Sequence, residues 1–351
     1  MIDEGDRTHL ERCAELAERG RRTAAPNPVV GSVVVRAGRV IGEGWHERPG
    51  GDHAEVAALH AAGDARGATV YVNLEPCSHH GRTPPCADAL IAAGVARVVT
   101  AMLDPTDKVN GAGVARLSAA GVAAEVAGGE IERAARRQNA WWLTLALLGR
   151  PHVTYKAAVS TDGHTASPAG PRWISAPESR AQVHELRAAM GAVAVGIGTV
   201  LADDPLLTAR DVDPPAQRQP LRVVFDRAAR LPIGSRLAAS AGPAQPVLVV
   251  CAPGAAPIAA PGVEMLHCES LAGALTELGR RRISALLLEG GATLATAFLD
   301  AGLIDRLMLY TAPIELGRGA GLFTRAVALP EPVSEASSGP DILSVSELRE
   351  P

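Results

Sequence analysis

Hydrophobic and polar positions follow two different periods along the first 126 residues. Short runs rich in valine alternate with alanine-rich segments of helical character, and glycine or proline stands at many of the junctions. The pattern predicts a strand pair at 29–35 and 38–45, then helices at 53–63, 84–94 and 113–120, which alternate with strands at 68–74, 96–102 and 122–126. Strands and helices in this order are typical of a layered α/β sheet.

A long helix is expected next, from about Glu130 to Leu148, because Gly149 and Pro151 stand where it must stop. The alternation then starts afresh, which indicates a second α/β domain. The fold class we predict is therefore α/β in two domains, residues 1–147 and 151–351. The second domain is expected to contain strands within 151–163, 192–198, 221–226, 246–250, 285–291 and 306–313, and helices near 175–189, 270–280 and 291–301.

Composition narrows the class of protein. A net charge of −4 on 351 residues gives no basic face, so bulk nucleic-acid binding is not expected. The opening MIDEGDRTHLERC lacks the apolar core of a signal peptide, and the longest apolar stretch, AWWLTLALLG, is too short to cross a bilayer. We expect a soluble, cytoplasmic protein without membrane contact. Five cysteines scattered over a chain of this kind favour free thiols and a metal site over disulfides.

Four residues in the first domain have the spacing of a hydrolytic metal centre. His53 and Glu55 begin one predicted helix, Cys77 follows a predicted strand, and Cys86 begins another helix. His53, Cys77 and Cys86 supply the three protein ligands of a catalytic zinc site that keeps its fourth position open for water. A helix start also favours the thiolate that zinc requires. Glu55 would then be free to transfer protons. Each residue alone could be structural, and it is the ordered set that predicts zinc.

The set resembles the HxE and PCxxC signature of zinc nucleobase deaminases, in which a metal-bound hydroxide attacks the carbon bearing an amino group and the glutamate moves protons. The run PCSHHGRTPPC, with eight residues between its cysteines, and PNPVVG at 26–31 resemble more specifically the pyrimidine deaminase of riboflavin biosynthesis. That resemblance implies a catalytic Glu55 and a substrate pocket bordered by the enlarged loop. It places Asn27, His79 and Arg82 near a phosphorylated pyrimidine. His46, His60 and His80 receive no role.

Two segments of the second domain are expected to bind a nucleotide. In LLLEGGATLATAFL a strand ends at Glu289, Gly290 and Gly291 allow close approach to the backbone, and a helix begins. Such a helix start can hold a pyrophosphate, although close packing alone would also explain the glycines. GxGxxG is missing, which argues against an ordinary Rossmann site.

With YKAAVSTDG, RWIS, ELRA and GTVLADDPLLTAR, these segments resemble the reductase half of the same riboflavin enzymes, whose fold is like that of dihydrofolate reductase. The resemblance covers about residues 7–320 and implies zinc and NADPH as cofactors. Arg227 stands where the family often has a small polar residue. The implied substrate contacts are Lys156, Arg187, Leu207, Arg210 and Glu289. The implied NADPH contacts are Val159, Trp173, Thr199, Asp203, Gly291, Ala292, Thr293, Leu294, Ala295, Thr296 and Ala297.

The function implied is a bifunctional enzyme of riboflavin biosynthesis, which deaminates a phosphorylated pyrimidine and then reduces its ribosyl chain. One alternative is a nucleoside or tRNA deaminase with a non-catalytic second domain, against which the missing basic stripe counts. Another is a zinc-stabilised structural protein, which would not need Glu55. The expected partner is the small-molecule substrate. Oligomeric state stays open, and a homo-oligomer is compatible with the sequence.

Overall fold

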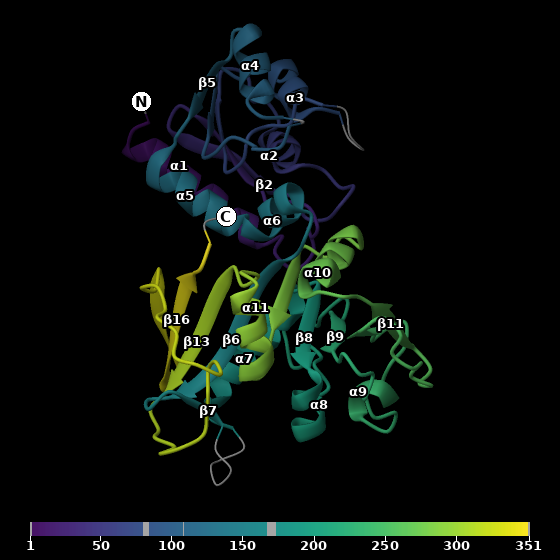
Figure 1. Ribbon diagram of the computed structural model, residues 1–351. Coiled ribbons are helices and arrows are strands. Elements are labelled where there is room, and N and C mark those ends of the chain that lie inside the picture. The colour runs from purple at the N-terminus through teal and green to yellow at the C-terminus, as the bar shows by residue number, and fades with distance from the viewer. Residues whose placement is uncertain (1, 80–83, 108, 167–172, 350–351) are drawn as a thin grey trace. The chain divides into compact units, whose positions relative to one another are not determined.

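The computed structural model of the protein describes residues 2–79, 84–107, 109–166 and 173–349. Its chain divides into two compact units, one ending at Leu148 and the other beginning at Gly149 (Figure 1). Among the described residues, no helix is both long and apolar enough to cross a membrane.

The first unit is built on a five-stranded sheet in the order β2-β1-β3-β4-β5. β1 pairs antiparallel with both β2 and β3, whereas β3, β4 and β5 run parallel. Its strands are β1 (Gly31–Arg36), β2 (Arg39–Trp45), β3 (Thr69–Val72), β4 (Arg97–Thr100) and β5 (Ala123–Val126). Its helices are α1 (Glu4–Glu18), α2 (Ala54–Ala62), α3 (Cys86–Ala92), α4 (Ala112–Ala119), α5 (Gly129–Gln138) and α6 (Ala140–Leu148).

Alternating strand residues send side chains to two separate cores, because successive side chains of a strand point to opposite faces. Val33 and its equivalents on β3 and β4 pack with α1, α5 and α6, in a core that includes Leu10, Leu16, Tyr71, Val99, Ala135 and Leu143. Val34 and its equivalents pack with α2, α3 and α4, in a core that includes Ala58, Val70, Leu90, Val98 and Leu117. The sheet is thus covered by helices on both faces.

The single long helix predicted for 130–148 is wrong in detail, because the chain forms α5 and α6 with Asn139 between them. The Asn139 side chain accepts a hydrogen bond from the Val29 amide (2.9 Å) and donates one to the Val29 carbonyl (3.1 Å). An asparagine engaged with another backbone segment in this way competes with a regular helix. The helix α1 was also not expected from the hydrophobic pattern, although Asp3 and Asp6 form a reciprocal cap at its start.

The second unit contains a nine-stranded sheet in the order β11-β10-β9-β8-β12-β6-β13-β16-β15. The strands from β11 to β13 in that order are parallel, and β16 and β15 complete the edge in antiparallel pairing. The strands are β6 (His152–Ser160), β8 (Ala192–Gly196), β9 (Leu221–Phe225), β10 (Val247–Cys251), β11 (Val263–His267), β12 (Ala285–Leu288), β13 (Arg306–Ala312), β15 (Ser334–Ser338) and β16 (Asp341–Glu347), and β7 (His164–Ala166) and β14 (Ala320–Gly321) form a separate pair.

In the described part of this unit, the helices are α7 (Pro177–Ala189), α8 (Ile197–Asp203), α9 (Arg236–Ala239), α10 (Leu271–Arg280) and α11 (Ala292–Asp300). Central strands such as β10 and β12 are buried at every position, which explains why their sequences are uninterrupted apolar runs. The pattern did not predict β11, β15 or β16, whose residues are largely polar or partly exposed. Because the central strands are parallel, their carboxyl ends lie at one edge, where ligands of open α/β sheets bind.

Candidate active sites

The three candidate zinc ligands meet where two helices of the first unit begin. His53 is the N-cap residue of α2, and Cys86 is the first residue of α3. Cys77 lies in the segment after β3, and its Sγ accepts a hydrogen bond from the Cys86 amide (3.3 Å). Two glycines of β2 let α2 approach closely, since a Cβ at Gly42 would lie 2.3 Å from the Ala58 carbonyl oxygen and one at Gly44 2.4 Å from the Ala58 nitrogen.

The donor atoms of this group have the separations of a tetrahedral zinc site. His53 Nδ1 lies 3.1 Å from Cys86 Sγ and 3.6 Å from Cys77 Sγ. All three donors lie within 4.8 Å of one another. Zinc bound at about 2.1 Å from nitrogen and about 2.3 Å from sulfur would place tetrahedral ligand atoms about 3.6 Å apart. The residues therefore fit a zinc ion held by one imidazole and two thiolates.

Proton affinities in this cluster differ strongly between neighbouring groups. A hydrogen bond from the Cys86 thiol lowers the pKa of Cys77 to about 4, whereas the same bond and burial raise the pKa of Cys86. The sequence predicted a lowered thiol pKa at Cys86, because this residue begins a helix. In the structure it is the pKa of Cys77 that is lowered. Burial raises the pKa of Glu55 to about 7, against the opposing effect of His53. A carboxyl group with such a pKa can both accept and donate a proton near neutrality.

His46, which sequence reasoning left without a role, connects Asn27 to this centre. The Asn27 side-chain amide donates to His46 Nε2 (3.0 Å), and His46 Nδ1 donates to the Asp52 carbonyl (2.9 Å). Burial lowers the pKa of His46, which favours the neutral ring that this arrangement needs. Its ring centroid lies 5.5 Å from that of His53. Asn27 is thereby held beside the ligand set, and a histidine after a strand is too weak a signal to have shown it.

The structure places the predicted substrate residues of the enlarged loop only in part. His79 is exposed two positions after Cys77, and it is near enough to Asp104 to oppose the rise in the pKa of that carboxyl, whose main cause is burial. Arg82 lies outside the described residues.

Glu75 is a buried carboxylate that the sequence analysis also missed. Its Oε1 accepts backbone hydrogen bonds from Gly113 (2.9 Å) and Val114 (3.2 Å). Its Oε2 accepts from Gly111 (2.9 Å) and Asp104 (3.1 Å). A Cβ at Gly113 would lie 2.0 Å from the Pro76 carbonyl oxygen. Glu75 therefore fastens the start of α4 and the segment before it to the strand end that carries Cys77. An acidic residue before PC gives no sequence signal for these contacts.

In the second unit, a cleft of about 830 Å³ lies at the carboxyl ends of the parallel strands. It brings together residues that follow β8 and β12. A Cβ at Gly291, the N-cap of α11, would lie 4.0 Å from Thr199 Oγ1 on α8. The predicted cofactor residues that line the cleft are Thr199, Asp203, Gly291, Ala292, Thr293, Leu294 and Ala297. A helix start facing a cleft of this size fits a dinucleotide pyrophosphate.

Four other predicted cofactor residues do not line this cleft. Ala295 is fully buried, and Thr296 accepts a hydrogen bond from the Thr324 amide (2.9 Å), because both face the core side of α11. Val159 lines a separate pocket with Leu309 and Phe323. Trp173 is 59% exposed, with the Arg180 guanidinium 5.5 Å from its ring centroid. A cofactor contact at these positions stays a prediction.

The predicted substrate residues of the second unit form a connected group of charges. Arg187 is ion-paired with Glu289, and its Nη1 also donates to the Thr208 carbonyl (3.2 Å). Arg210 is exposed, and its Nη1 donates to Thr208 Oγ1 (2.8 Å). Lys156 is half-buried, and burial lowers its pKa while Glu289 opposes the shift.

Leu207 lies in the same segment as Thr208, is buried, and has a positive φ of 55°. Arg187 pairs with Glu289, and both Arg187 and Arg210 donate to Thr208, the residue after Leu207. A substrate contact at these five positions stays a prediction.

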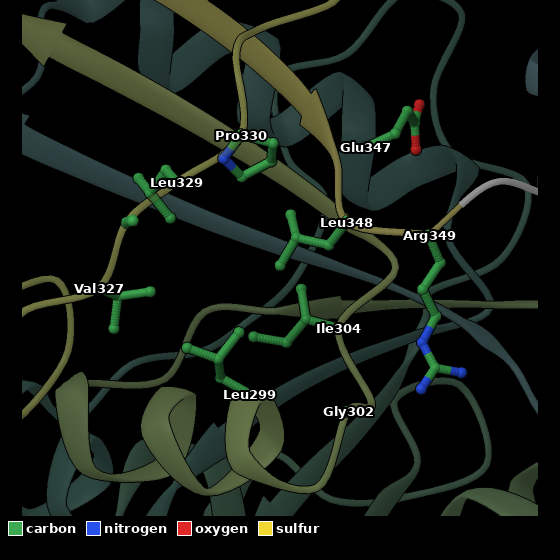
Figure 2. Close-up of a pocket in the computed structure, with 10 residues that line it drawn as sticks. Leu299, Gly302, Ile304, Val327, Leu329, Pro330, Glu347, Leu348 and Arg349 are labelled. Carbon is green, nitrogen blue, oxygen red and sulfur yellow. The ribbon is translucent and has the colours of Figure 1, made fainter.

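A further pocket lies near the chain's C-terminal end (Figure 2). Leu299, Ile304 and Leu348 approach one another there, and Arg349 lies at the margin. Glu347 is already paired with Arg306 (2.7 Å). None of the predicted site residues that the structure describes lines this pocket.

The histidine and two thiols with an adjacent buried carboxyl group define a zinc-dependent deaminase, joined to a nucleotide-binding α/β unit. Residues 3–102 match the cytidine and deoxycytidylate deaminase zinc-binding region, and residues 151–331 match the RibD C-terminal domain. The chain belongs to the RibD family, the bifunctional deaminase/reductases of riboflavin biosynthesis.

Relatives match over nearly the full length. The riboflavin biosynthesis protein RibD of Escherichia coli K12 is 42% identical over 345 residues, which is 91% of each chain. The solved structure of Acinetobacter baumannii RibD, form 1, has a TM-score of 0.85 and 38% identity, covering 97% of this chain and 98% of that one. A Thermotoga maritima structure, described as a diaminohydroxyphosphoribosylaminopyrimidine deaminase/5-amino-6-(5-phosphoribosylamino)uracil reductase, has a TM-score of 0.86 and 34% identity, covering 98% of both chains.

These matches confirm several predictions made from the sequence. The fold class is α/β, with a cytidine-deaminase-like domain followed by a dihydrofolate-reductase-like domain. The chain combines deaminase and reductase activities, and its cofactors are zinc and NADPH. The individual site residues and the independence of the two domains stay predictions.

Proposed function

We propose that the two units act in succession on one phosphorylated pyrimidine. The first unit would deaminate 2,5-diamino-6-ribosylamino-4(3H)-pyrimidinone 5′-phosphate with release of ammonia. The second would reduce the ribosyl chain of the product to ribityl, giving 5-amino-6-(5-phosphoribitylamino)uracil. The observation that carries the proposal is the cluster of His53, Cys77 and Cys86 donors beside the buried Glu55. The likeness to the Thermotoga maritima deaminase/reductase supports the choice of substrate.

In the deaminase site, His53, Cys77 and Cys86 would hold zinc, which supplies a bound water of pKa about 7 when present. Glu55 would take a proton from the attacking water and deliver it to the leaving amino group, a role that suits its raised pKa of about 7. Asn27, held by His46, would orient the pyrimidine ring. Glu55 is buried, so its carboxyl group is shielded from bulk solvent.

In the reductase site, NADPH supplies a hydride when bound. The ribosyl group must be open or imine-like, so that C1′ accepts the hydride and the attached nitrogen gains a proton. Arg210 has an exposed guanidinium that suits a phosphate group. Arg187 already donates through three of its nitrogens, so we propose that it orients Glu289 toward the substrate rather than holding the phosphate alone. Lys156 would contact the substrate from β6.

The test is to measure ammonia release and NADPH oxidation separately on the phosphorylated pyrimidine, with cytidine and unmodified tRNA as alternative substrates. Both activities on the pyrimidine alone are expected. Ammonia release from cytidine or tRNA without NADPH oxidation would favour a nucleoside or tRNA deaminase. A chain that binds zinc but shows neither activity would favour a structural role. The cytoplasmic location stays a prediction from the sequence, and the oligomeric state stays open.

A further inference from the structure

Two arginines lie at one end of the cleft in the second unit. Arg227 and Arg230 follow the end of β9, and both line the same cleft as Thr199 and Gly291. Ser270, the N-cap of α10, lines it as well. Two cationic side chains therefore line a part of the cleft for which the sequence predicted no cofactor contact.

The strand order sets where these arginines lie relative to the α11 start. β12, β8 and β9 are consecutive neighbours in the sheet. Neighbouring strands are about 4.8 Å apart, so the ends of β12 and β9 are separated by about 10 Å. If the start of α11 at Gly291 holds the pyrophosphate, Arg227 and Arg230 lie one strand beyond the α8 residues, on the side away from β6, where Lys156 is predicted to contact the substrate. The nicotinamide must face the substrate, so this side is left for the adenosine ribose. In nucleotide-binding α/β sheets, the residue that reads the ribose also follows a neighbouring strand.

The two arginines differ in how far their charge is already neutralised. Arg230 Nε lies 3.4 Å from Asp226 Oδ1, and Asp226 is buried. For Arg227, no carboxylate partner is present in the part of the chain that the structure describes, and its side chain is exposed. Two acidic residues, Asp203 and Glu269, also line the cleft and would oppose an anion. An unneutralised guanidinium beside them makes the end of the cleft selective for a ligand that carries its own phosphate there.

We propose that Arg227, assisted by Arg230, binds the 2′-phosphate of NADPH and so sets the preference for NADPH over NADH. This inference rests on the reductase function proposed above. A planar guanidinium donates two parallel hydrogen bonds to phosphate oxygens, which a small polar side chain cannot do. Arg230 contributes less because Asp226 shares its charge. The affinity for NADPH should accordingly depend on salt more strongly than the affinity for NADH.

The experiment measures the dissociation constants of NADPH, NADH, 2′-AMP and 5′-AMP for the full-length chain by calorimetry at two salt concentrations. Arg227→Ser should weaken binding of NADPH and 2′-AMP at least about tenfold and change binding of NADH and 5′-AMP less than about twofold. Arg230→Ser should have a smaller effect in the same direction. The matched control is Arg218→Ser, an exposed arginine of the same unit that does not line the cleft. It should bind all four ligands like the wild type.

Three results would overturn the proposal. Equal weakening of NADPH and NADH in Arg227→Ser would mean that the arginine acts on the shared part of the dinucleotide or on folding, which the thermal midpoint of the variant separates. Unchanged NADPH binding would place the 2′-phosphate elsewhere. If the wild-type chain binds NADPH no more tightly than NADH, the proposed 2′-phosphate site is wrong, although the proposed reductase function is not contradicted. If the wild-type chain binds neither NADPH nor NADH, the proposed reductase function is contradicted as well.

Discussion

Arg187 and Glu289 form a two-point ion pair in the second unit, with Nε 2.7 Å from Oε1 and Nη2 2.8 Å from Oε2. Their side chains are only 13% and 12% exposed. Removal of one partner of a buried pair leaves the other charge uncompensated, at a cost of about 3 to 5 kcal/mol. Of the two arginines predicted to contact the substrate, Arg187 is therefore held in an ion pair, whereas the exposed Arg210 is available to a phosphate group.

Arg187→Ala should lower the free energy of unfolding of the second unit by about 3 kcal/mol or more. The double variant Arg187→Ala with Glu289→Gln should recover part of the loss, because the remaining side chain is uncharged. Urea unfolding monitored by tryptophan fluorescence measures both. Arg210→Ala is the matched variant, and it should raise the reductase KM with little change in stability. The idea fails if Arg187→Ala unfolds like the wild type.

Glu55→Gln should keep one zinc ion per chain and lose ammonia release by about 10² to 10⁴, because the amide fills the same space without moving protons. Metal analysis and an ammonia assay check the two halves of this expectation. Deamination at a near-normal rate in the zinc-loaded variant would show that another group carries the proton. His53→Ala and Cys86→Ala should instead lose the metal.

Glu75→Gln should weaken the first unit, because glutamine offers one acceptor oxygen where the carboxylate oxygens receive four backbone hydrogen bonds. Loss of two such bonds should lower the free energy of unfolding by about 3 kcal/mol and raise the deaminase KM, since the start of α4 is then no longer fastened to the Cys77 segment. Glu130→Gln, on an exposed side chain of the same unit, is the control. An unchanged urea midpoint and KM would count against the fastening role.

Lys156→Arg should lower reductase turnover at least about tenfold, a barrier change near 1.4 kcal/mol, although the charge is kept. Lys156 is half-buried on β6, with Nζ 5.7 Å from the Tyr310 ring centroid. The broader, planar guanidinium should not place its charge where the compact ammonium does. NADPH oxidation on substrate that has already been deaminated is the measurement. Zinc content and ammonia release should not change. Wild-type turnover in the variant would mean that positive charge alone suffices.

The second unit should lose stability in mild acid because of His152. Burial lowers the pKa of His152 to about 3, and its Nδ1 has no hydrogen-bond partner among the described residues. The unfolded chain, with a histidine pKa of about 6.5, then binds one more proton than the folded chain between pH 6.5 and 3. The free energy of unfolding should therefore fall as the pH falls below about 6.5, by up to about 1.4 kcal/mol per pH unit.

Urea midpoints of the wild type and of His152→Gln at pH 7.5 and pH 5 test this expectation. A glutamine side chain that packs poorly in the core would lower the stability of the variant at every pH. The comparison is therefore between the changes in urea midpoint from pH 7.5 to pH 5 in the two proteins, and not between their absolute stabilities. An equal dependence in both proteins would assign the acid sensitivity to other groups.

The zinc ligand set could be predicted from the sequence because the chemistry of a hydrolytic zinc site restricts residue type, number and order at once. The central strands could be predicted for a different reason. Strands such as β10 and β12 are buried on both faces, so every position must be apolar, and the run is visible without knowledge of its neighbours.

Only the tertiary structure decided what polar groups at long sequence separation do. Arg187 meets Glu289 across 102 positions, Asn139 meets Val29 across 110, and Glu75 meets Gly113 across 38. Such contacts depend on how helices and strands pack. A glutamate or asparagine that makes them has the same local pattern as one in solvent, because hydrogen bonding is directional and short-ranged while hydrophobic burial recurs with a period along the chain. The sequence alone therefore determined the zinc donors and the alternation of the sheets, and packing determined which charges are neutralised and which, like Arg227, are left to meet a ligand.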